Sequence, residues 1–195
     1  MTWKKIVICG SRGSGKKEFL QSLSNEIFYT IVPDNSLNQK DFGFALGELA
    51  DYRAELILAC ERVIQLQYPL DSHVLYENSL FNSVAYSALR VSSIINDGTG
   101  ENEEALVWTM TMHMCARMLR DTLDVDAIIY LPGNDGTKFG KDLEESLREV
   151  LEFVDKDKVF ILSSKDLLQR TEEAAKIVKA LNAEGTINQE SPGEN

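Results

Sequence analysis

The chain has 195 residues, of which 44% are apolar and 26% are charged, and it contains only 4 prolines. This composition is typical of a globular domain and excludes disorder along the whole chain. Folding a chain of this length buries roughly 70% of the unfolded surface, so a layered core needs no disulfide or metal for stability. The net charge of −11 is opposite to that of a nucleic-acid-binding protein. We therefore expect neither duplex nucleic acid nor an anionic membrane as a partner.

The apolar pattern alternates between short strands and longer helices along the whole chain. Strands are predicted at residues 3–9, 31–33, 73–76, 125–131 and 158–162. Helices are predicted at residues 19–27, 45–67, 80–95, 101–121, 139–154 and 167–181. This alternation predicts an α/β fold of three layers, with a mostly parallel five-stranded sheet and helices on both of its faces.

A row of large apolar residues recurs at every fourth position of the predicted helix 101–121, namely Leu106, Met110, Met114 and Met118. This spacing is typical of one helix face, and we expect the row to pack into the core. No internal repeat interrupts the pattern, so residues 1–182 are predicted to form a single domain. Residues 183–195 are acidic, lack basic residues and contain Gly, Ser and Pro, which predicts a disordered tail.

The three cysteines, Cys9, Cys60 and Cys115, lie far apart in apolar segments. This distribution is typical of buried thiols in a reducing compartment, so we expect no disulfide bond. The N-terminal segment lacks the apolar stretch of a signal peptide, and no segment approaches the roughly 18 consecutive apolar residues of a membrane span. These features predict a cytoplasmic protein.

A glycine-rich loop joins the first predicted strand to the first predicted helix. Residues 10–16 read Gly-Ser-Arg-Gly-Ser-Gly-Lys, which is the G-x-x-x-x-G-K spacing of a phosphate-binding loop. Glycines let the backbone turn its N–H groups inward, the helix contributes its positive end, and the lysine adds a charge for terminal phosphates. The residues predicted to bind a nucleotide here are Gly10, Ser11, Arg12, Gly13, Ser14, Gly15, Lys16 and Lys17.

Charge is unevenly distributed around this loop. The first 17 residues contain five basic residues and no acidic residue, although the whole chain carries a net charge of −11. Lys17 departs from the motif, because a Ser or Thr hydroxyl normally stands there and ligates Mg²⁺, whereas a protonated lysine cannot. Either Mg²⁺ is held through water and carboxylates, or Lys17 replaces part of its charge, or nucleotide binding and turnover are impaired.

Shorter motifs follow the loop in a fixed order along residues 3–182. They are Ile-Val-Pro-Asp at 31–34, Val-Leu-Tyr-Glu-Asn-Ser at 74–79, Val-Ala-Tyr at 84–86, Tyr-Leu-Pro at 130–132 and Asp-Gly-Thr-Lys at 135–138. Together with the loop, they resemble the small P-loop kinases of nucleosides and nucleotides, especially phage-type deoxynucleoside monophosphate kinases and nicotinamide riboside kinase-like ATPases. The resemblance implies the P-loop NTPase fold, ATP and Mg²⁺ as cofactors, and a small-molecule acceptor such as a deoxynucleoside monophosphate. A phage-encoded protein of this kind would act in the host cytoplasm.

The resemblance also implies roles for individual residues. Lys16 would bind the donor phosphates, and Asp34 would contact the phosphoryl acceptor. Glu77 and Asn78 stand where the family carries an Asp-Arg pair that binds the metal and the acceptor phosphate. Glu77 can orient a metal-bound water or take a proton, and it ends a strand where α/β sheets bind ligands, but Asn78 has no guanidinium. In the family, a lid segment with the pattern Asp-Gly-x-Arg closes over the donor phosphates. Lys138 stands at the position of this arginine, so the positive charge is kept but the bidentate geometry of arginine is lost.

Lys17, Asn78 and Lys138 thus each depart from the family pattern at a position used in phosphoryl transfer. Two hypotheses follow. The first is an ATP-dependent kinase of a small nucleotide or nucleoside, with Lys16, Glu77 and Lys138 as catalytic residues and Glu77 at the metal. The second is a catalytically degenerate P-loop protein that binds a nucleotide as a structural ligand, or a protein partner through its acidic surface. A homodimer through a long helix is compatible with the resemblance, but no residue requires it.

Overall fold

The structure is a computed structural model, and it describes residues 3–34, 51–67, 71–77, 80–97, 102–122 and 124–187. At its centre is a five-stranded sheet with the order β2-β3-β1-β4-β5, in which all neighbouring strands are parallel. The strands are β1 (Lys5–Cys9), β2 (Thr30–Val32), β3 (Val74–Glu77), β4 (Ala127–Tyr130) and β5 (Val159–Ile161). The predicted parallel five-stranded sheet is confirmed.

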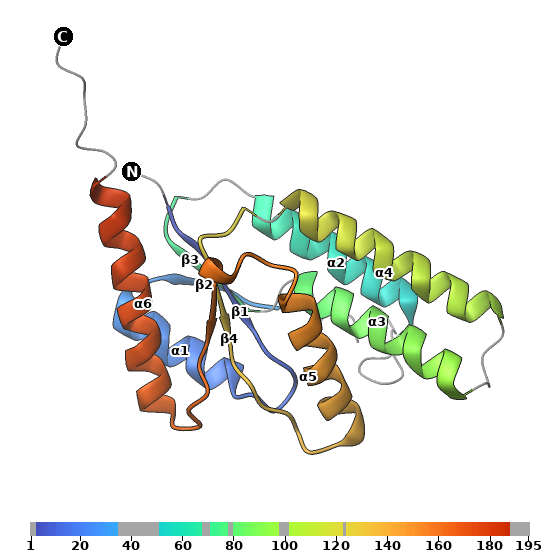
Figure 1. Cartoon of the computed structure of the whole chain (residues 1–195). Helices are drawn as coiled ribbons and strands as arrows, with labels where there is room; N and C mark the ends of the chain where they lie inside the picture. Colours follow the sequence, from blue (N-terminus) through green and yellow to red (C-terminus); the bar gives the residue numbers. More distant parts are fainter. Residues whose placement is uncertain are drawn as a thin grey trace, which may run out of the picture.

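Helices cover both faces of this sheet (Figure 1). The helices are α1 (Lys16–Ile27), α2 (Tyr52–Gln67), α3 (Leu80–Asp97), α4 (Asn102–Thr122), α5 (Lys138–Leu151) and α6 (Leu167–Ile187). A short 3₁₀ turn, η3 (Lys156–Lys158), precedes β5. Helices α1 and α6 pack together on one face, α2, α3 and α5 lie on the other, and α4 packs over α2 and α3. The first part of the helix predicted at 45–67 lies outside the described residues.

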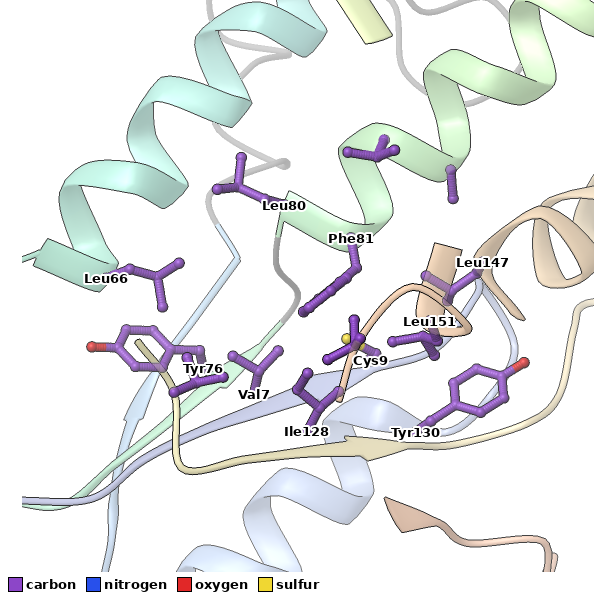
Figure 2. Close-up of a cluster of buried hydrophobic side chains, with 14 of the residues drawn as sticks. Val7, Cys9, Leu66, Tyr76, Leu80, Phe81, Ile128, Tyr130, Leu147 and Leu151 are labelled. Atoms are coloured by element: carbon purple, nitrogen blue, oxygen red, sulfur yellow. The ribbon is translucent and has the colours of Figure 1, made fainter. Parts of the chain in front are cut away.

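Each face of the sheet has its own apolar core, because successive residues of a strand point to opposite sides. In β1, Ile6 and Ile8 pack under α1 and α6, whereas Val7 and Cys9 face α3 and α5. Figure 2 shows the second core, in which the side chains of β1, β3 and β4 meet those of the covering helices. Burial on both sides explains why the strands read as continuous apolar runs.

The outward face of α4 contradicts one sequence prediction. Leu106, Met110 and Met114 are 59%, 57% and 47% exposed and do not pack into the core, whereas Met118, at the end of the row, is partly buried and packs against the core as predicted. The buried face of α4 carries Trp108 and Cys115 instead, and Trp108 lies edge-on to Tyr86 of α3. The prediction was wrong because helical spacing identifies a face but does not show which face its neighbours cover.

The cysteines also differ from expectation in one case. Cys9 and Cys115 are buried as predicted, but Cys60 is exposed on α2. Burial raises the pKa of the Cys115 thiol to about 12. Cys115 therefore stays protonated at neutral pH and packs as a small apolar side chain.

The C-terminal helix continues past the predicted domain boundary at residue 182. Helix α6 ends at Ile187, so the helix includes the start of the segment predicted as a tail. Residues 188–195 lie outside the described part of the chain. Among the described helices, none has the length and apolar character needed to cross a membrane.

Candidate functional site

The glycine-rich loop connects the end of β1 at Cys9 to the start of α1 at Lys16. Gly13 and Gly15 adopt positive φ angles of 86° and 79°, which favour glycine over residues with a Cβ atom. Gly15 caps α1 without a side-chain acceptor, so the N–H groups of the first helical turn face no capping oxygen. The Ser14 hydroxyl is buried and lacks a hydrogen-bond partner within the described residues. The loop thus presents several donors that an anion can satisfy.

The side chain of Lys16 folds back over this loop. Its Nζ donates to the carbonyl oxygens of Gly10 at 2.6 Å and Ser11 at 3.1 Å. The Gly10 carbonyl also accepts a hydrogen bond from Asn82 Nδ2 of α3 at 3.2 Å. Burial lowers the pKa of Lys16, and nearby acidic groups, Glu77 and Asp34 among them, oppose this shift. By contrast, the neighbouring Lys17 is exposed.

Two of the predicted acidic site residues meet at the ends of neighbouring strands. Asp34 follows β2 and Glu77 ends β3, and these strands pair in parallel with Val32 opposite Tyr76. The Asp34 N–H donates to Glu77 Oε2 at 3.3 Å. The structure therefore brings Asp34 and Glu77 together near Lys16, at the carboxyl ends of the strands. Asn78 lies outside the described residues.

A buried arginine that the sequence analysis did not single out holds Asp34 in place. Arg62 of α2 pairs with Asp34 Oδ1 at 3.2 Å and with Glu55 Oε1 at 3.5 Å, and it also donates to Ser83 Oγ of α3. Burial alone would lower the pKa of Arg62, but Asp34 and Glu55 raise it. Burial raises the pKa of Glu55, and Arg62 opposes this shift. The one available sequence signal is that Glu55 and Arg62 lie seven residues apart on one helix face.

The loop after β4 packs directly against the glycine-rich loop. Ser11 Oγ donates to the Gly133 carbonyl, and a Cβ atom on Gly13 would lie 2.6 Å from the Asn134 carbonyl carbon. Glu144 of α5 holds this second loop by accepting from Asn134 Nδ2 at 2.6 Å and from the Gly133 N–H at 3.3 Å. Burial would raise the pKa of Glu144, but these bonds and those from Arg148 lower it. Glu144 is a second residue that sequence reasoning missed.

The predicted lid residue Lys138 begins α5. Thr137 caps this helix by accepting from the Gly140 N–H at 2.9 Å, and hydrogen bonds from Thr137 lower the pKa of Asp135. Lys138 is exposed and lines a cavity of about 480 Å³ beside α3, together with Arg90. Lys16, Asp34 and Glu77 do not line that cavity. Of the predicted site residues that the structure describes, Lys138 alone lines that cavity.

Comparison with solved structures finds the same architecture in proteins of known activity. The chain superposes on NadR in complex with NAD and AMP-PNP with a TM-score of 0.71 at 17% identity, over 99% of this chain and 51% of NadR. It superposes on M. mycoides deoxyadenosine kinase with a TM-score of 0.63 at 14% identity, over 91% of this chain and 99% of the kinase. The chain has the fold of P-loop nucleoside and nucleotide kinases.

A thymidylate kinase extends this result to nucleotide kinases. The enzyme from Candida albicans gives a TM-score of 0.60 at 15% identity, covering 91% of this chain and 92% of the enzyme. The chain thus spans nearly all of the deoxyadenosine and thymidylate kinases but about half of NadR. No protein-family model and no curated protein sequence matches the chain. The likeness is one of fold, and it confirms the fold that the sequence motifs predicted.

Proposed function

We propose that the protein binds ATP in the loop of residues 10–16 and transfers the terminal phosphoryl group to a small nucleoside or nucleotide, such as a deoxynucleoside monophosphate. The observation that carries this proposal is the meeting of Lys16, Asp34 and Glu77 at the ends of adjacent parallel strands. Open α/β sheets bind their ligands at this edge. The fold shared with nucleoside and nucleotide kinases supports the same conclusion.

The donor nucleotide would occupy the glycine-rich loop. The backbone N–H groups and side chains of residues 10–17, which form the loop and the start of α1, would hold the β- and γ-phosphates. Lys16 would exchange its bonds to the Gly10 and Ser11 carbonyls for bonds to phosphate oxygens. This exchange replaces neutral acceptors with charged ones, and charge-assisted hydrogen bonds are the stronger kind.

The acceptor would lie on the side of Asp34 and Glu77. An acceptor oxygen attacks the γ-phosphorus, the bond from that phosphorus to the β,γ-bridging oxygen breaks, and ADP leaves. Glu77 would take the proton when the acceptor is a hydroxyl. Asp34, fixed by Arg62, would orient the acceptor, with Asn78 as a neutral contact and Lys138 closing from the lid.

The described residues fit a magnesium ion held mainly by phosphates and water. Mg²⁺ in phosphoryl-transfer sites needs only one or two protein carboxylates, and Glu77 would supply one. No three His, Cys, Asp or Glu side chains within the described ranges group into a dedicated metal cage. When bound, the ion would neutralise charge on the transferred phosphoryl group. Lys17 has no oxygen for it, so Glu77 would hold it through water.

Calorimetric titration tests the donor site. ATP and AMP-PNP are titrated into the wild type, Lys16→Ala, Lys17→Ala, Lys17→Ser and Lys179→Ala, each with and without Mg²⁺. Lys16→Ala should weaken binding roughly 10- to 100-fold, because a charged hydrogen bond is lost. Lys17→Ala tests whether the neighbouring charge contributes, and Lys179→Ala, which removes an exposed lysine of α6 outside the loop, is the control. Lys17→Ser restores the hydroxyl and should increase the effect of Mg²⁺ on binding.

A turnover assay tests the chemistry. Deoxynucleoside monophosphates and nucleosides are incubated with ATP, Mg²⁺ and protein, and phosphorylated products are measured by chromatography. Product formation that Lys16→Ala abolishes would support the kinase. Absence of any product from folded, ATP-binding protein would contradict it.

The alternative, a catalytically degenerate P-loop protein, is favoured by one observation. Lys17 is exposed at the position of the metal-binding hydroxyl, next to a loop that is otherwise intact. A protein of this kind would bind nucleotide with the same affinity in the presence and absence of Mg²⁺, and it would give no product with any acceptor. The two assays above separate it from the kinase.

A further inference from the structure

Arg170 links three loops at the edge of the sheet where the glycine-rich loop lies. It stands in the first turn of α6 and is only 7% exposed. Its Nη1 donates to the Ser14 carbonyl at 2.8 Å, its Nη2 donates to the Pro132 carbonyl at 3.1 Å, and its Nε donates to the Ser164 carbonyl. These carbonyls follow β1, β4 and β5, which are neighbours in the sheet. One side chain therefore fixes the ends of three adjacent strands relative to one another.

The charge of Arg170 has no acidic partner among the described residues. Its three acceptors are all neutral backbone carbonyls, and burial is the sole cause that lowers its pKa. Arg170 also lies at the positive ends of two helices. It belongs to the first turn of α6, and its Nη1 would lie 3.9 Å from a Cβ atom on Gly15, the N-cap of α1. A buried cation at such a place is unfavourable on its own and becomes favourable when an anion binds nearby.

The hydrogen bond to Ser14 also fixes the direction of a peptide group. The C=O and N–H of a trans peptide point in opposite directions, and no cis peptide occurs in the described chain. Because the Ser14 carbonyl points at Arg170, the Gly15 N–H points away from it. Arg170 therefore prevents this peptide from rotating, so the Gly15 N–H keeps one orientation in the loop.

We propose that Arg170 is a positioning residue for the donor nucleotide. It holds the Ser14–Gly15 peptide so that the N–H is directed to the phosphates, and its charge attracts those phosphates without contacting them. This inference rests on the proposed function, because it assumes that a nucleotide occupies the loop of residues 10–16. It makes Arg170 a cation of the donor site that comes from the far end of the chain.

The test compares Arg170→Gln and Arg170→Lys with the wild type. Arg120→Gln is the matched control, because Arg120 is exposed on α4 and its ion pair is with the adjacent Asp121. Dissociation constants for AMP-PNP and for inorganic tripolyphosphate are measured by calorimetry at low and high salt, and thermal unfolding is followed in parallel. We expect Arg170→Gln to raise the dissociation constants of both ligands at least roughly tenfold, because a nearby buried charge is lost.

The salt and lysine measurements separate positioning from folding. Salt screens buried charges much less than exposed ones, so the affinity difference between the wild type and Arg170→Gln should persist at high salt. Arg170→Lys keeps the charge but cannot reach all three carbonyls, so its affinity for both ligands should lie between those of the wild type and Arg170→Gln. If Arg170→Gln does not fold, the comparison of Arg170→Lys with the wild type is the test. Variants that unfold at lower temperature yet bind both ligands as the wild type does would overturn the inference while leaving the proposed function intact. Failure of the wild type to bind either ligand would overturn the proposed function, and the inference with it.

Discussion

The proposed donor and acceptor sides of the candidate site differ in the groups that form them. The donor side is formed mainly by backbone groups: its glycines adopt positive φ angles, and Arg170 holds the Ser14 carbonyl. On the acceptor side, charged side chains are buried against one another, with Arg62 between Asp34 and Glu55. Backbone N–H groups suit phosphates of any nucleotide, whereas a side-chain network suits one acceptor geometry. Under the proposed function, the backbone-built region would bind the nucleotide and the side-chain network would recognise the acceptor.

The two buried arginines show the difference most directly. Arg170 donates only to carbonyls, so its full charge remains available to attract an anion. Arg62 is already balanced by two carboxylates, so an anion reaching it must compete with both. Within the described residues, the same residue type therefore binds only neutral carbonyls on the proposed donor side and completes a salt-bridge network on the proposed acceptor side. Arg62 cannot replace the guanidinium that Asn78 lacks without losing an existing partner.

Replacing the acceptor-side arginine should produce the largest effect. Arg62→Met leaves the buried carboxylates of Asp34 and Glu55 without their cation, and breaking a buried pair in this way costs about 3–5 kcal/mol. Urea denaturation measures this loss. Lys179→Met is the control, because Lys179 and Glu26 form an exposed pair at 3.4 Å, and exposed pairs contribute at most about 1 kcal/mol. Equal losses in the two variants would show that the Arg62 network is no more important than a surface pair.

On the donor side, alanine substitutions of two glycines should separate backbone strain from loop packing. Gly13 and Gly136 have similar φ angles of 86° and 82°, so alanine is strained at both, by about 1–2 kcal/mol. A Cβ on Gly13 meets the backbone of Asn134 and Asp135 at 2.6 Å, whereas one on Gly136 meets nothing within 4 Å. Gly13→Ala should therefore destabilise the protein by about 1–3 kcal/mol more than Gly136→Ala, in urea denaturation. Similar values would mean that the loops do not depend on their close approach.

The fold was predictable because its signals are local. Two-sided burial makes each strand a continuous apolar run, and helix spacing locates every helix that the structure describes. Within the candidate site, Glu77 was singled out because it ends a strand, where α/β sheets bind ligands, whereas Asp34 was suggested by the family resemblance; the structure places the two side by side. The exposed row on α4 shows the limit, since spacing alone could not distinguish its outer face from Trp108 and the buried face.

The missed residues act on segments outside their own helices, and two of them act across long separations in the chain. The contact from Arg170 to Ser14 spans 156 residues, and that from Arg62 to Asp34 spans 28. Neither arginine belongs to a motif, and each lies on a helix where a solvent-exposed position is the ordinary expectation. Glu144 likewise reaches back to a loop that precedes its helix. Their roles depend on how helices pack against the sheet, and no local pattern encodes that packing.

The smallest expected effect concerns the second carboxylate of the Arg62 network. Burial raises the pKa of Glu55 in the folded state above its usual value of 4.5, and Arg62 opposes this shift without cancelling it. The folded state therefore binds this proton more tightly than the unfolded state does. The stability that Glu55 contributes is full below pH 4.5 and is lost as the pH rises through the folded-state pKa.

Glu55→Gln removes this titration while nearly preserving the shape of the side chain, and Asp34 still pairs with Arg62. The free energy of unfolding, measured by urea denaturation from pH 4.5 upward, should therefore fall less steeply in Glu55→Gln than in the wild type. Glu26→Gln, at an exposed position, should follow the wild type. Parallel curves for Glu55→Gln and the wild type would mean that Glu55 keeps an ordinary pKa. Arg62 would then offset the effect of burial on Glu55 completely, and the contrast with the donor side would rest on the Arg62 ion pairs alone.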